Sequence, residues 1–236
     1  MFTLFFVEDL PTSVGAEYEF DNDDASHAIR VLRTQVDDQF MLSDGNGAWS
    51  KVKATAIKKK SMTVQVLETG FQEPLATRIT VVQAIPKGDR SKEAIELLTE
   101  AGVDRIVPWL ATRSIGKTSE KFQITAREAS KQSRRFRIPE VTGVAQSAQI
   151  CEAIGLSDLA IVFHESAVTK LSDQISSHNV ENLLIIIGPE GGITDQELEA
   201  FKDAGAKVAL MGRPILRSAH AGIAAVSAVS ALLKVW

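Results

Sequence analysis

The sequence predicts an α/β domain with a mostly parallel sheet, preceded by a small β-barrel. Short strand-like segments follow one another closely up to about residue 71, which is typical of a small barrel. From residue 78 onward strands alternate with helices, an order typical of a parallel sheet covered by helices. The apolar run 183–187 indicates a buried strand, and it stops at the loop Gly188-Pro189-Glu190-Gly191-Gly192.

Turn residues divide the first region into strands. Asp44-Gly45 and Asn46-Gly47 favour a hairpin between two alternating strands. Residues 24–32 have the pattern of a short capped helix, and residues 70–74 mark the boundary of the region. We expect strands at 3–7, 39–43, 48–54 and 61–67.

Capping signals place the helices of the second region. Ser91 is expected to cap the helix after the first strand, and either Thr194 or Asp195 the helix after the glycine loop. A further helix is expected over 124–136. The last helix, 219–233, is apolar on nearly every face, so it is expected to be buried all round or to pack on a partner. We expect strands at 79–85, 103–107, 159–163, 183–187 and 207–211.

Composition limits the class of protein. The chain has 236 residues, of which 44% are hydrophobic and 24% charged, with a net charge of −4 and a single cysteine, Cys151. One cysteine excludes an intrachain disulfide framework and fits a reducing cytosol. The first residues lack a basic segment and reach acids early, so we expect no signal peptide, and no apolar run is long enough for a bilayer span. These features predict a soluble cytoplasmic protein with no membrane partner.

Basic charge is concentrated in two segments, although the net charge argues weakly against non-specific nucleic-acid binding. For Lys58-Lys59-Lys60 a solvated face is the better interpretation. In the segment 131–137, Phe136 lies among arginines. For this segment, a solvated face and a nucleic-acid contact are two interpretations of about equal weight.

Three predicted strands of the second region end in loops of unusual composition, at 163–166, 188–192 and 210–218. If these strands are neighbours, the loops converge at the carboxyl ends of the sheet, where ligands bind in open α/β folds. The glycine loop has a proline and an acid where a phosphate cradle would have glycine and lysine, which favours a ligand with positive charge. The glycine motifs of dinucleotide and triphosphate sites are missing, and the His and Cys residues have no metal-ligand spacing.

Basic side chains occupy two further positions of interest. Lys87 and Arg90 directly follow the first strand of the second region, at its carboxyl end. His27, Arg30 and Arg33 are spaced to share one face of the first predicted helix. That face is either an ordinary surface or one that grips an RNA backbone.

The order and spacing of these segments resemble the ribosomal RNA small subunit methyltransferase E family. The likeness covers essentially the whole chain, and the set is specific although each motif alone is modest. It rests on the residues at 27–33, 44–47, 87–90, 97–108, 113–114, 129–135, 138–139, 188–192 and 215–218.

The resemblance implies a SPOUT-class methyltransferase. Its parallel-sheet domain, residues 73–236, would contain a deep trefoil knot, a rare exception to unknotted topology, and would follow a PUA-like RNA-binding barrel at residues 1–72. The family is expected to act as a homodimer that moves a methyl group from S-adenosyl-L-methionine to N3 of a uridine in 16S rRNA, either as naked RNA or in the small ribosomal subunit. Such a displacement needs no metal, and a cationic sulfonium suits the acidic glycine loop.

Expected roles follow from the resemblance and from the reaction. Uridine N3 becomes nucleophilic once its proton leaves, and a positive group near the uracil oxygens would stabilise the anion; we expect Arg217 in that role. Glu190 is either the proton acceptor or a residue that shapes the loop and orients the ligand. The expected cofactor-binding residues are His164, Glu165, Gly188, Pro189, Glu190, Gly191, Gly192, Leu210, Met211, Gly212, Ile215, Leu216 and Ser218. The expected RNA-binding residues are His27, Arg30, Arg33, Lys87, Arg90, Lys131, Arg134 and Arg135.

The third motif departs from the family pattern. The family commonly has Arg-Ile-Leu-Arg-Thr-Glu-Thr-Ala, whereas residues 214–221 run Pro-Ile-Leu-Arg-Ser-Ala-His-Ala. Arg213 lies one position before the place of the first arginine, and Ala219 stands where the family has an acid. Two alternatives remain open: a methyltransferase of the same class that acts on tRNA or 23S rRNA, and an RNA-binding assembly factor without catalysis, which the altered motif favours.

Overall fold

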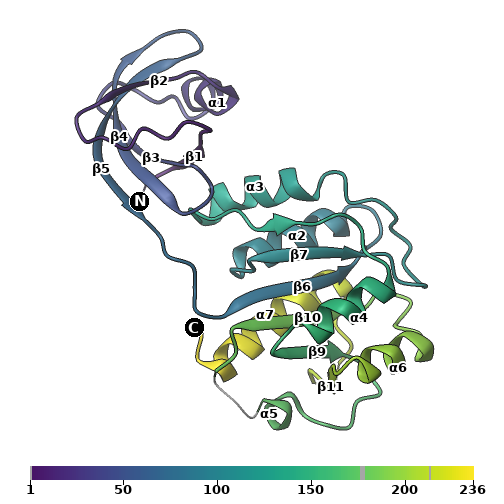
Figure 1. Cartoon of the computed structure of the whole chain (residues 1–236). Coiled ribbons are helices and arrows are strands. Elements are labelled where there is room, and N and C mark those ends of the chain that lie inside the picture. The colour runs from purple at the N-terminus through teal and green to yellow at the C-terminus, as the bar shows by residue number, and fades with distance from the viewer. Residues whose placement is uncertain (1, 176–178, 213) are drawn as a thin grey trace. The chain divides into compact units, whose positions relative to one another are not determined.

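The chain forms two compact units. A computed structural model describes residues 2–175, 179–212 and 214–236 (Figure 1). One unit comprises Met1–Pro74 with Ser130–Ile138, and the other comprises Leu75–Ala129 with Pro139–Trp236. Residues 130–138, which lie inside the expected second domain, therefore pack with the first unit.

The first unit is a five-stranded sheet in the order β1-β3-β4-β5-β2. Strand β1 pairs in parallel with β3, and the other neighbours are antiparallel. The strands expected around the Asp44–Gly47 turns are confirmed, whereas β2 was not expected from the sequence. The elements are β1 Leu4–Phe6, β2 Glu17–Phe20, α1 Asp23–Arg30, β3 Gln39–Ser43, β4 Ala48–Ile57 and β5 Met62–Phe71.

Three phenylalanines show that this sheet curls around its core. Phe5 lies on β1 and Phe20 on β2, the two outer strands, yet their ring centroids are only 5.5 Å apart. Phe40 of β3 packs edge-on against Phe5 at 5.4 Å. All three rings are buried. Side chains thus close the sheet, as expected of a small barrel.

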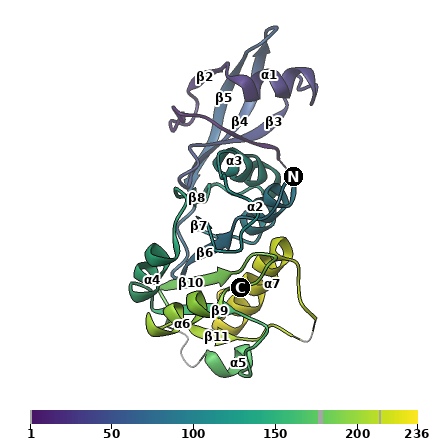
Figure 2. The ribbon, with the colours of Figure 1, turned by 90° about the vertical axis from the view of Figure 1, so that its right-hand side faces the viewer.

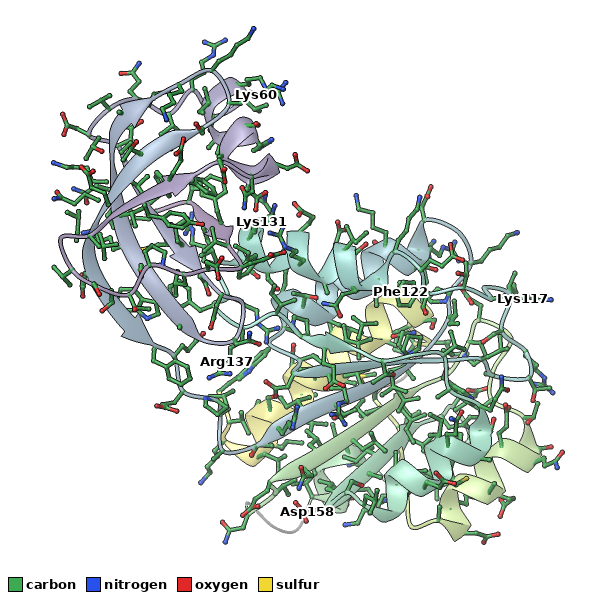
Figure 3. The ribbon with its side chains drawn as sticks, turned by 45° about the horizontal axis from the view of Figure 1, so that its top comes forward. Lys60, Lys117, Phe122, Lys131, Arg137 and Asp158 are labelled. Carbon is green, nitrogen blue, oxygen red and sulfur yellow. The ribbon has the colours of Figure 1, made fainter. Side chains whose placement is uncertain are left out.

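Within the first unit, the segment 130–138 packs against the sheet through aromatic contacts and a close approach to a glycine. Phe136 stacks on Trp49 of β4 at 5.7 Å, and the guanidinium of Arg137 lies over the ring of Phe71 at 5.0 Å (Figure 3). Gly47 has φ +111, and a Cβ there would lie 2.5 Å from Nη2 of Arg137. Close approach of the arginine therefore requires glycine at this position.

The second unit is built on a six-stranded sheet in the order β11-β9-β10-β6-β7-β8, and all its neighbouring strands are parallel. This confirms the parallel sheet predicted from the sequence. The strands are β6 Arg78–Ala84, β7 Arg105–Trp109, β8 Glu140–Val141, β9 Leu159–Phe163, β10 Asn182–Ile187 and β11 Lys207–Ala209.

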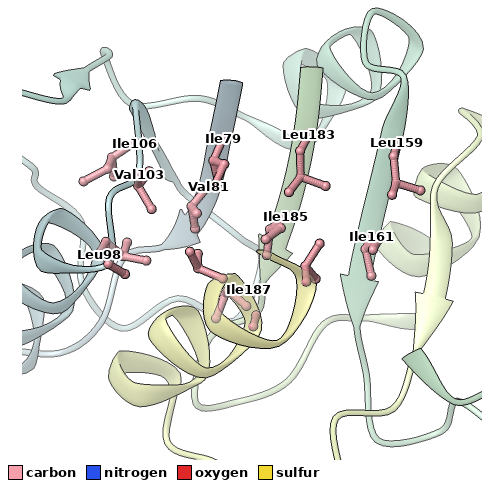
Figure 4. Packing of buried hydrophobic residues seen from close by; sticks show 14 of the residues in the cluster. Ile79, Val81, Leu98, Val103, Ile106, Leu159, Ile161, Leu183, Ile185 and Ile187 are labelled. Atoms are coloured by element: carbon pink, nitrogen blue, oxygen red, sulfur yellow. The ribbon is translucent and has the colours of Figure 1, made fainter. Parts of the chain in front are cut away.

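Helices cover both faces of this sheet, with α2 and α7 on one and α4 and α6 on the other (Figure 2). After the exposed Asn182, every residue of strand β10 is apolar because both faces of the strand are buried. Leu183, Ile185 and Ile187 join the core on the α7 side (Figure 4), whereas Leu184 and Ile186 join the core on the α4 side. The helices are α2 Arg90–Glu100, α3 Phe122–Ser133, α4 Ser147–Gly155, α5 Leu171–Gln174, α6 Asp195–Asp203 and α7 Ser218–Leu233.

Two expected helix caps have different outcomes. Thr194 is confirmed as the N-cap of α6, because its hydroxyl accepts the backbone N–H of Glu197 at 3.2 Å. Ser91 is not a cap: α2 begins at Arg90, and the Ser91 hydroxyl instead donates to the carbonyl of Pro86 at 2.6 Å. That bond connects the first turn of α2 to Pro86, which lies just after the end of β6. The trefoil knot implied by the resemblance stays a prediction.

Candidate active site

The three strand-end loops of the second unit meet in one pocket of about 660 Å³. Strands β11, β9, β10 and β6 lie side by side, and Phe163 at the end of β9 pairs in register with Ile187 and Ala209. The loops that follow these three strands therefore begin at the same edge of the sheet. Every expected cofactor-binding residue and Arg217 line this pocket. Phe163 and Pro214, from the expected loops, also line it, as do Ile187, Ile193 and Ala221, which were not predicted.

Each glycine of the loop after β10 meets a steric demand. A Cβ at Gly188 would lie 2.7 Å from Cγ1 of Ile193, which folds back over it. Gly192 has φ +77 and donates its N–H to the carbonyl of Pro189 at 2.9 Å, which closes a turn. A Cβ at Gly191 would lie 3.0 Å from Cβ of Arg113. The loop is therefore compact and presents backbone rather than side chains.

Glu190 connects this loop to the end of β6. Its Oε1 accepts the backbone N–H of Lys87 at 3.4 Å and lies 4.0 Å from Nη1 of Arg90. The Glu190 side chain is only 21% exposed. Lys87 and Arg90, predicted as RNA ligands, thus lie beside the glycine loop within the same unit.

The start of α7 is connected to the glycine loop by a hydroxyl. Ser218 donates to the carbonyl of Gly188 at 2.8 Å and accepts from Nε2 of Gln83 at 3.0 Å. Arg217 precedes it as the N-cap residue of α7 and is exposed, with no side-chain hydrogen bond or ion pair in the described part of the chain. Arg213, which lies one position before the place of the family's first arginine, is outside the described residues.

The remaining wall combines a histidine, an acid and apolar side chains. His164 Nδ1 is 2.8 Å from the hydroxyl of Ser166, and its Nε2 is 3.8 Å from Glu165, whose side chain is 59% exposed. Ile215 and Leu216 are 82% and 42% exposed although they are apolar. Exposed apolar side chains inside a concave site suit a ligand with a flat hydrophobic part.

A buried carboxylate lies behind the glycine loop and was not singled out from the sequence. Glu197, only 5% exposed, accepts the backbone N–H groups of Thr112 at 2.8 Å and Thr194 at 3.0 Å, as well as both threonine hydroxyls. Burial raises the pKa of the Glu197 carboxyl, but these hydrogen bonds outweigh burial and bring the pKa below its ordinary value. A Thr-x-x-Glu capping box is the only sequence signal for it.

The predicted RNA-binding residues of the first unit differ in exposure. His27 and Arg30 are exposed on α1, and Arg33 follows the helix with φ +58. Arg134 is exposed with φ +58 just after α3, and Arg135 is partly buried. A positive φ is uncommon for a residue with a side chain.

Lys131 has a different environment. Its ammonium lies 2.7 Å from Asp24, and the two side chains are only 10% and 12% exposed (Figure 3). The ion pair connects the last turn of α3 to α1 within the first unit. The ammonium of Lys131 is therefore paired with a carboxylate and largely covered, which favours a structural role for this side chain. Its expected contact with RNA stays a prediction.

Comparisons with known proteins agree with this architecture. Residues 73–230 match the family model of an RNA methyltransferase domain, and residues 20–67 match that of an RNA methyltransferase PUA domain. A ribosomal RNA small subunit methyltransferase E of Mycobacterium tuberculosis is 35% identical over 245 residues, which cover 99% of this chain and 93% of the relative. The chain belongs to the small subunit methyltransferase E family.

Further relatives and solved structures extend the match. The Bacillus subtilis member is 27% identical over 239 residues, which cover 95% of this chain and 91% of the relative. A crystal structure of the Neisseria gonorrhoeae member bound to S-adenosyl methionine has a TM-score of 0.87 at 26% identity and covers 98% of both chains. A probable rRNA-methyltransferase from Porphyromonas gingivalis has a TM-score of 0.82 at 26% identity, again over 98% of both chains. These findings confirm the predicted fold class and family.

The described segments contain neither a metal-binding cluster nor a helix that could span a membrane. There, no group of three or more His, Cys, Asp or Glu side chains could hold a metal ion. No helix among residues 2–175, 179–212 and 214–236 is long and apolar enough to cross a membrane.

Proposed function

We propose that this chain binds S-adenosyl-L-methionine in the strand-end pocket and methylates N3 of a uridine in 16S rRNA of the small ribosomal subunit. The observation that carries the proposal is the convergence of three loops on one pocket, in a family with a member solved in complex with S-adenosyl methionine. The cytoplasm is the proposed location, in keeping with the single Cys151.

The pocket has the chemistry that this cofactor needs. The compact glycine loop presents backbone groups for the adenosyl part, and the exposed apolar side chains of Ile215 and Leu216 offer a surface for a flat ring. Two acids, Glu165 and Glu190, line the pocket and favour a positively charged ligand. Its volume of about 660 Å³ is within the usual range for a small-molecule site.

When bound, S-adenosyl-L-methionine supplies a methyl group activated by a positively charged sulfur. The N3–methyl bond forms as the sulfur–methyl bond breaks, the bonding electrons stay on sulfur, and the N3 proton leaves to solvent or a base. The pocket walls orient the reactants and exclude water. Arg217, exposed at the start of α7 and facing the pocket, would stabilise the uracil anion through its oxygens.

For Glu190 we favour the role of shaping the loop over that of proton acceptor. Its carboxylate already accepts the N–H of Lys87 and faces the guanidinium of Arg90. The carboxylate is thus engaged with the end of β6, which fits a role in holding the glycine loop. Replacement of Glu190 by Gln should therefore weaken cofactor binding more than it slows the chemical step.

RNA is proposed to contact exposed basic residues in each unit. In the first unit these are His27, Arg30, Arg33 and Arg134, joined by the partly buried Arg135, and in the second they are Lys87 and Arg90. Their contribution is electrostatic, so RNA affinity should fall steeply with salt.

A homodimer is proposed through α7. Small residues such as Ala224, Ser227, Ala228 and Ala231 form the side of α7 that is not fully buried, and small residues permit close helix packing. Sedimentation velocity of the full chain would test this: the proposal requires a species of twice the chain mass of 25.6 kDa.

Methylation assays on three substrates test the reaction. Purified chain and labelled S-adenosyl-L-methionine are incubated with small ribosomal subunits that lack the modification, with tRNA and with large subunits. We expect label only in 16S rRNA, as 3-methyluridine. Label in tRNA or 23S rRNA would favour the second methyltransferase alternative, and failure to bind the cofactor in calorimetry would favour the non-catalytic assembly factor.

A further inference from the structure

We propose that Glu197 is a positioning residue, which fixes the glycine loop in the shape that binds S-adenosyl-L-methionine. This inference rests on the proposed function of the pocket. Glu197 does not line the pocket; it lies behind its glycine wall, in the first turn of α6. Among the residues that the structure describes, it is the only charged residue that is buried.

Hydrogen-bond donors surround both oxygens of this carboxylate. Oε1 accepts the N–H of Thr112 at 2.8 Å, its hydroxyl at 3.0 Å and the hydroxyl of Ser147 at 3.1 Å. Oε2 accepts the N–H of Thr194 at 3.0 Å and its hydroxyl at 2.7 Å. No ion pair involves Glu197 among the residues that the structure describes. The negative charge is therefore stabilised by oriented dipoles, which have fixed geometry.

These donors come from the elements around the loop. Thr194 directly follows Gly191-Gly192-Ile193, Thr112 belongs to the segment after β7, and Ser147 begins α4. Ser147 also accepts the indole N–H of Trp109, which is fully buried, at 3.2 Å. Glu197 thus connects the downstream end of the glycine loop, at Thr194, to the segment after β7 and to the start of α4.

The residue next to Thr112 contacts the same loop at its tip. Arg113 donates from Nη1 to the carbonyl of Gly191 at 3.1 Å, and its Cβ lies against the Cα of Gly191. Thr112 and Arg113 therefore hold the loop at two places, one through Glu197 at Thr194 and one directly at Gly191. The position of the segment 112–113, and with it the loop, depends on the carboxylate.

A neutral isostere makes a sharp test. Glu197→Gln keeps the size of the side chain but replaces one acceptor oxygen by an NH₂ group. Whichever way the amide turns, its NH₂ faces the backbone N–H of either Thr112 or Thr194, and that N–H loses its acceptor. The loop should then shift or loosen without any change in the residues that line the pocket.

The experiment measures cofactor affinity and kinetics on the full chain. We expect Glu197→Gln to raise the Kd for S-adenosyl-L-methionine and its KM by roughly tenfold, the size expected when a buried donor loses its partner, with a much smaller change in the KM for small subunits. Glu199→Gln on the same helix is the matched control, because Glu199 is 65% exposed and pairs only with Lys202 at 2.7 Å in the described structure. It should leave both constants unchanged.

A second variant guards against loss of folding. Thr112→Val removes one hydroxyl donor at an exposed residue and keeps its N–H, so it should raise the Kd in the same direction by about threefold. A folded Glu197→Gln protein with wild-type Kd and KM would overturn the positioning role. If Glu197→Gln does not fold, a wild-type Kd in Thr112→Val would overturn it. Absence of cofactor binding by the wild-type chain would instead refute the proposed function.

Discussion

The hydroxyl of Ser218 donates to the carbonyl oxygen of Gly188 over 2.8 Å. This bond joins the first turn of α7 to the start of the glycine loop, and Gln83 of β6 donates to the same hydroxyl at 3.0 Å. Gln83 is fully buried and its Oε1 has no partner in the described structure. One small side chain thus connects the start of α7, the glycine loop and strand β6.

Replacement of Ser218 by Ala should destabilise the protein. The change leaves the Nε2 of Gln83 and the carbonyl of Gly188 each with one partner fewer, at a cost of roughly 1–3 kcal/mol in the free energy of unfolding. Urea denaturation followed by circular dichroism measures this. Ser227→Ala on the same helix is the control. Within the described structure the Ser227 hydroxyl bonds only to the helix carbonyl of Ile223, at 2.8 Å, so the effect should stay within about 0.5 kcal/mol. Equal losses of unfolding free energy in the two variants would argue against a stabilising role for the Ser218 hydroxyl.

Gly188→Ala should disrupt cofactor binding. Its Cβ would lie 2.7 Å from Cγ1 of Ile193, which is too close, so Ile193 or the loop must move. Calorimetric titration with S-adenosyl-L-methionine should show a Kd raised about tenfold or more, because the loop is the wall of the pocket. Gly155→Ala, with no atom within 4 Å of the new Cβ, should bind normally. Normal binding by Gly188→Ala would mean that the loop does not hold the cofactor.

Arg217→Gln should slow the chemical step while cofactor binding persists. Arg217 is exposed and makes no described side-chain bond, so the fold does not depend on it. Loss of one stabilising donor at a developing anion typically lowers kcat about 100-fold or more. Single-turnover methylation of small subunits measures the rate, with Lys92→Gln on α2 as the charge-loss control. If Arg217→Gln retains the wild-type rate, the anion is stabilised by another group.

The stability that Glu197 provides should depend on pH. Its folded pKa is below the ordinary value of 4.5, so the charged carboxylate stabilises the fold fully above about pH 4.5. That contribution is lost as pH falls through the lower folded pKa. The difference in unfolding free energy between wild type and Glu197→Gln should therefore be constant near neutral pH and shrink in acid. A difference that grows in acid would contradict the environment described for this carboxylate.

Lys131 should matter for stability rather than for RNA. Its ion pair with Asp24 is about nine-tenths covered, so Lys131→Gln removes a cation from beside a covered carboxylate and should lower the free energy of unfolding by up to roughly 3 kcal/mol. Thermal unfolding measures the loss, with the exposed Lys59→Gln as control. If folded Lys131→Gln binds RNA markedly less well than Lys59→Gln at the same temperature, Lys131 also contributes to RNA binding.

The pocket was predictable from sequence because its chemistry follows the order of the strands. Apolar runs locate β9 and β10, and polar or glycine-rich residues directly after them mark their carboxyl ends. His164 and Gly188 therefore meet as expected once the strands pair in parallel. Register and strand neighbours, which no local pattern gives, come from packing on both faces of the sheet.

Features that depend on contacts between distant segments were missed. Glu197 has the pattern of an exposed helix residue, and its burial arises only because Thr112 and Ser147 reach it from other elements. The basic appearance of 131–137 concealed the ion pair of Lys131 and the stacking of Phe136 on Trp49. Strand β2 was missed because the sequence Glu-Tyr-Glu-Phe buries a single residue, Phe20.

The most direct test is the mapping of modified uridines in 16S rRNA from a strain without this protein. Mass spectrometry of nuclease fragments would compare that strain with the parent and with strains complemented by the wild-type chain or by Arg217→Gln. We predict that one 3-methyluridine is lost in the deletion strain, restored by the wild-type chain and not by Arg217→Gln. A complete set of 3-methyluridines in the deletion strain would contradict the proposed activity.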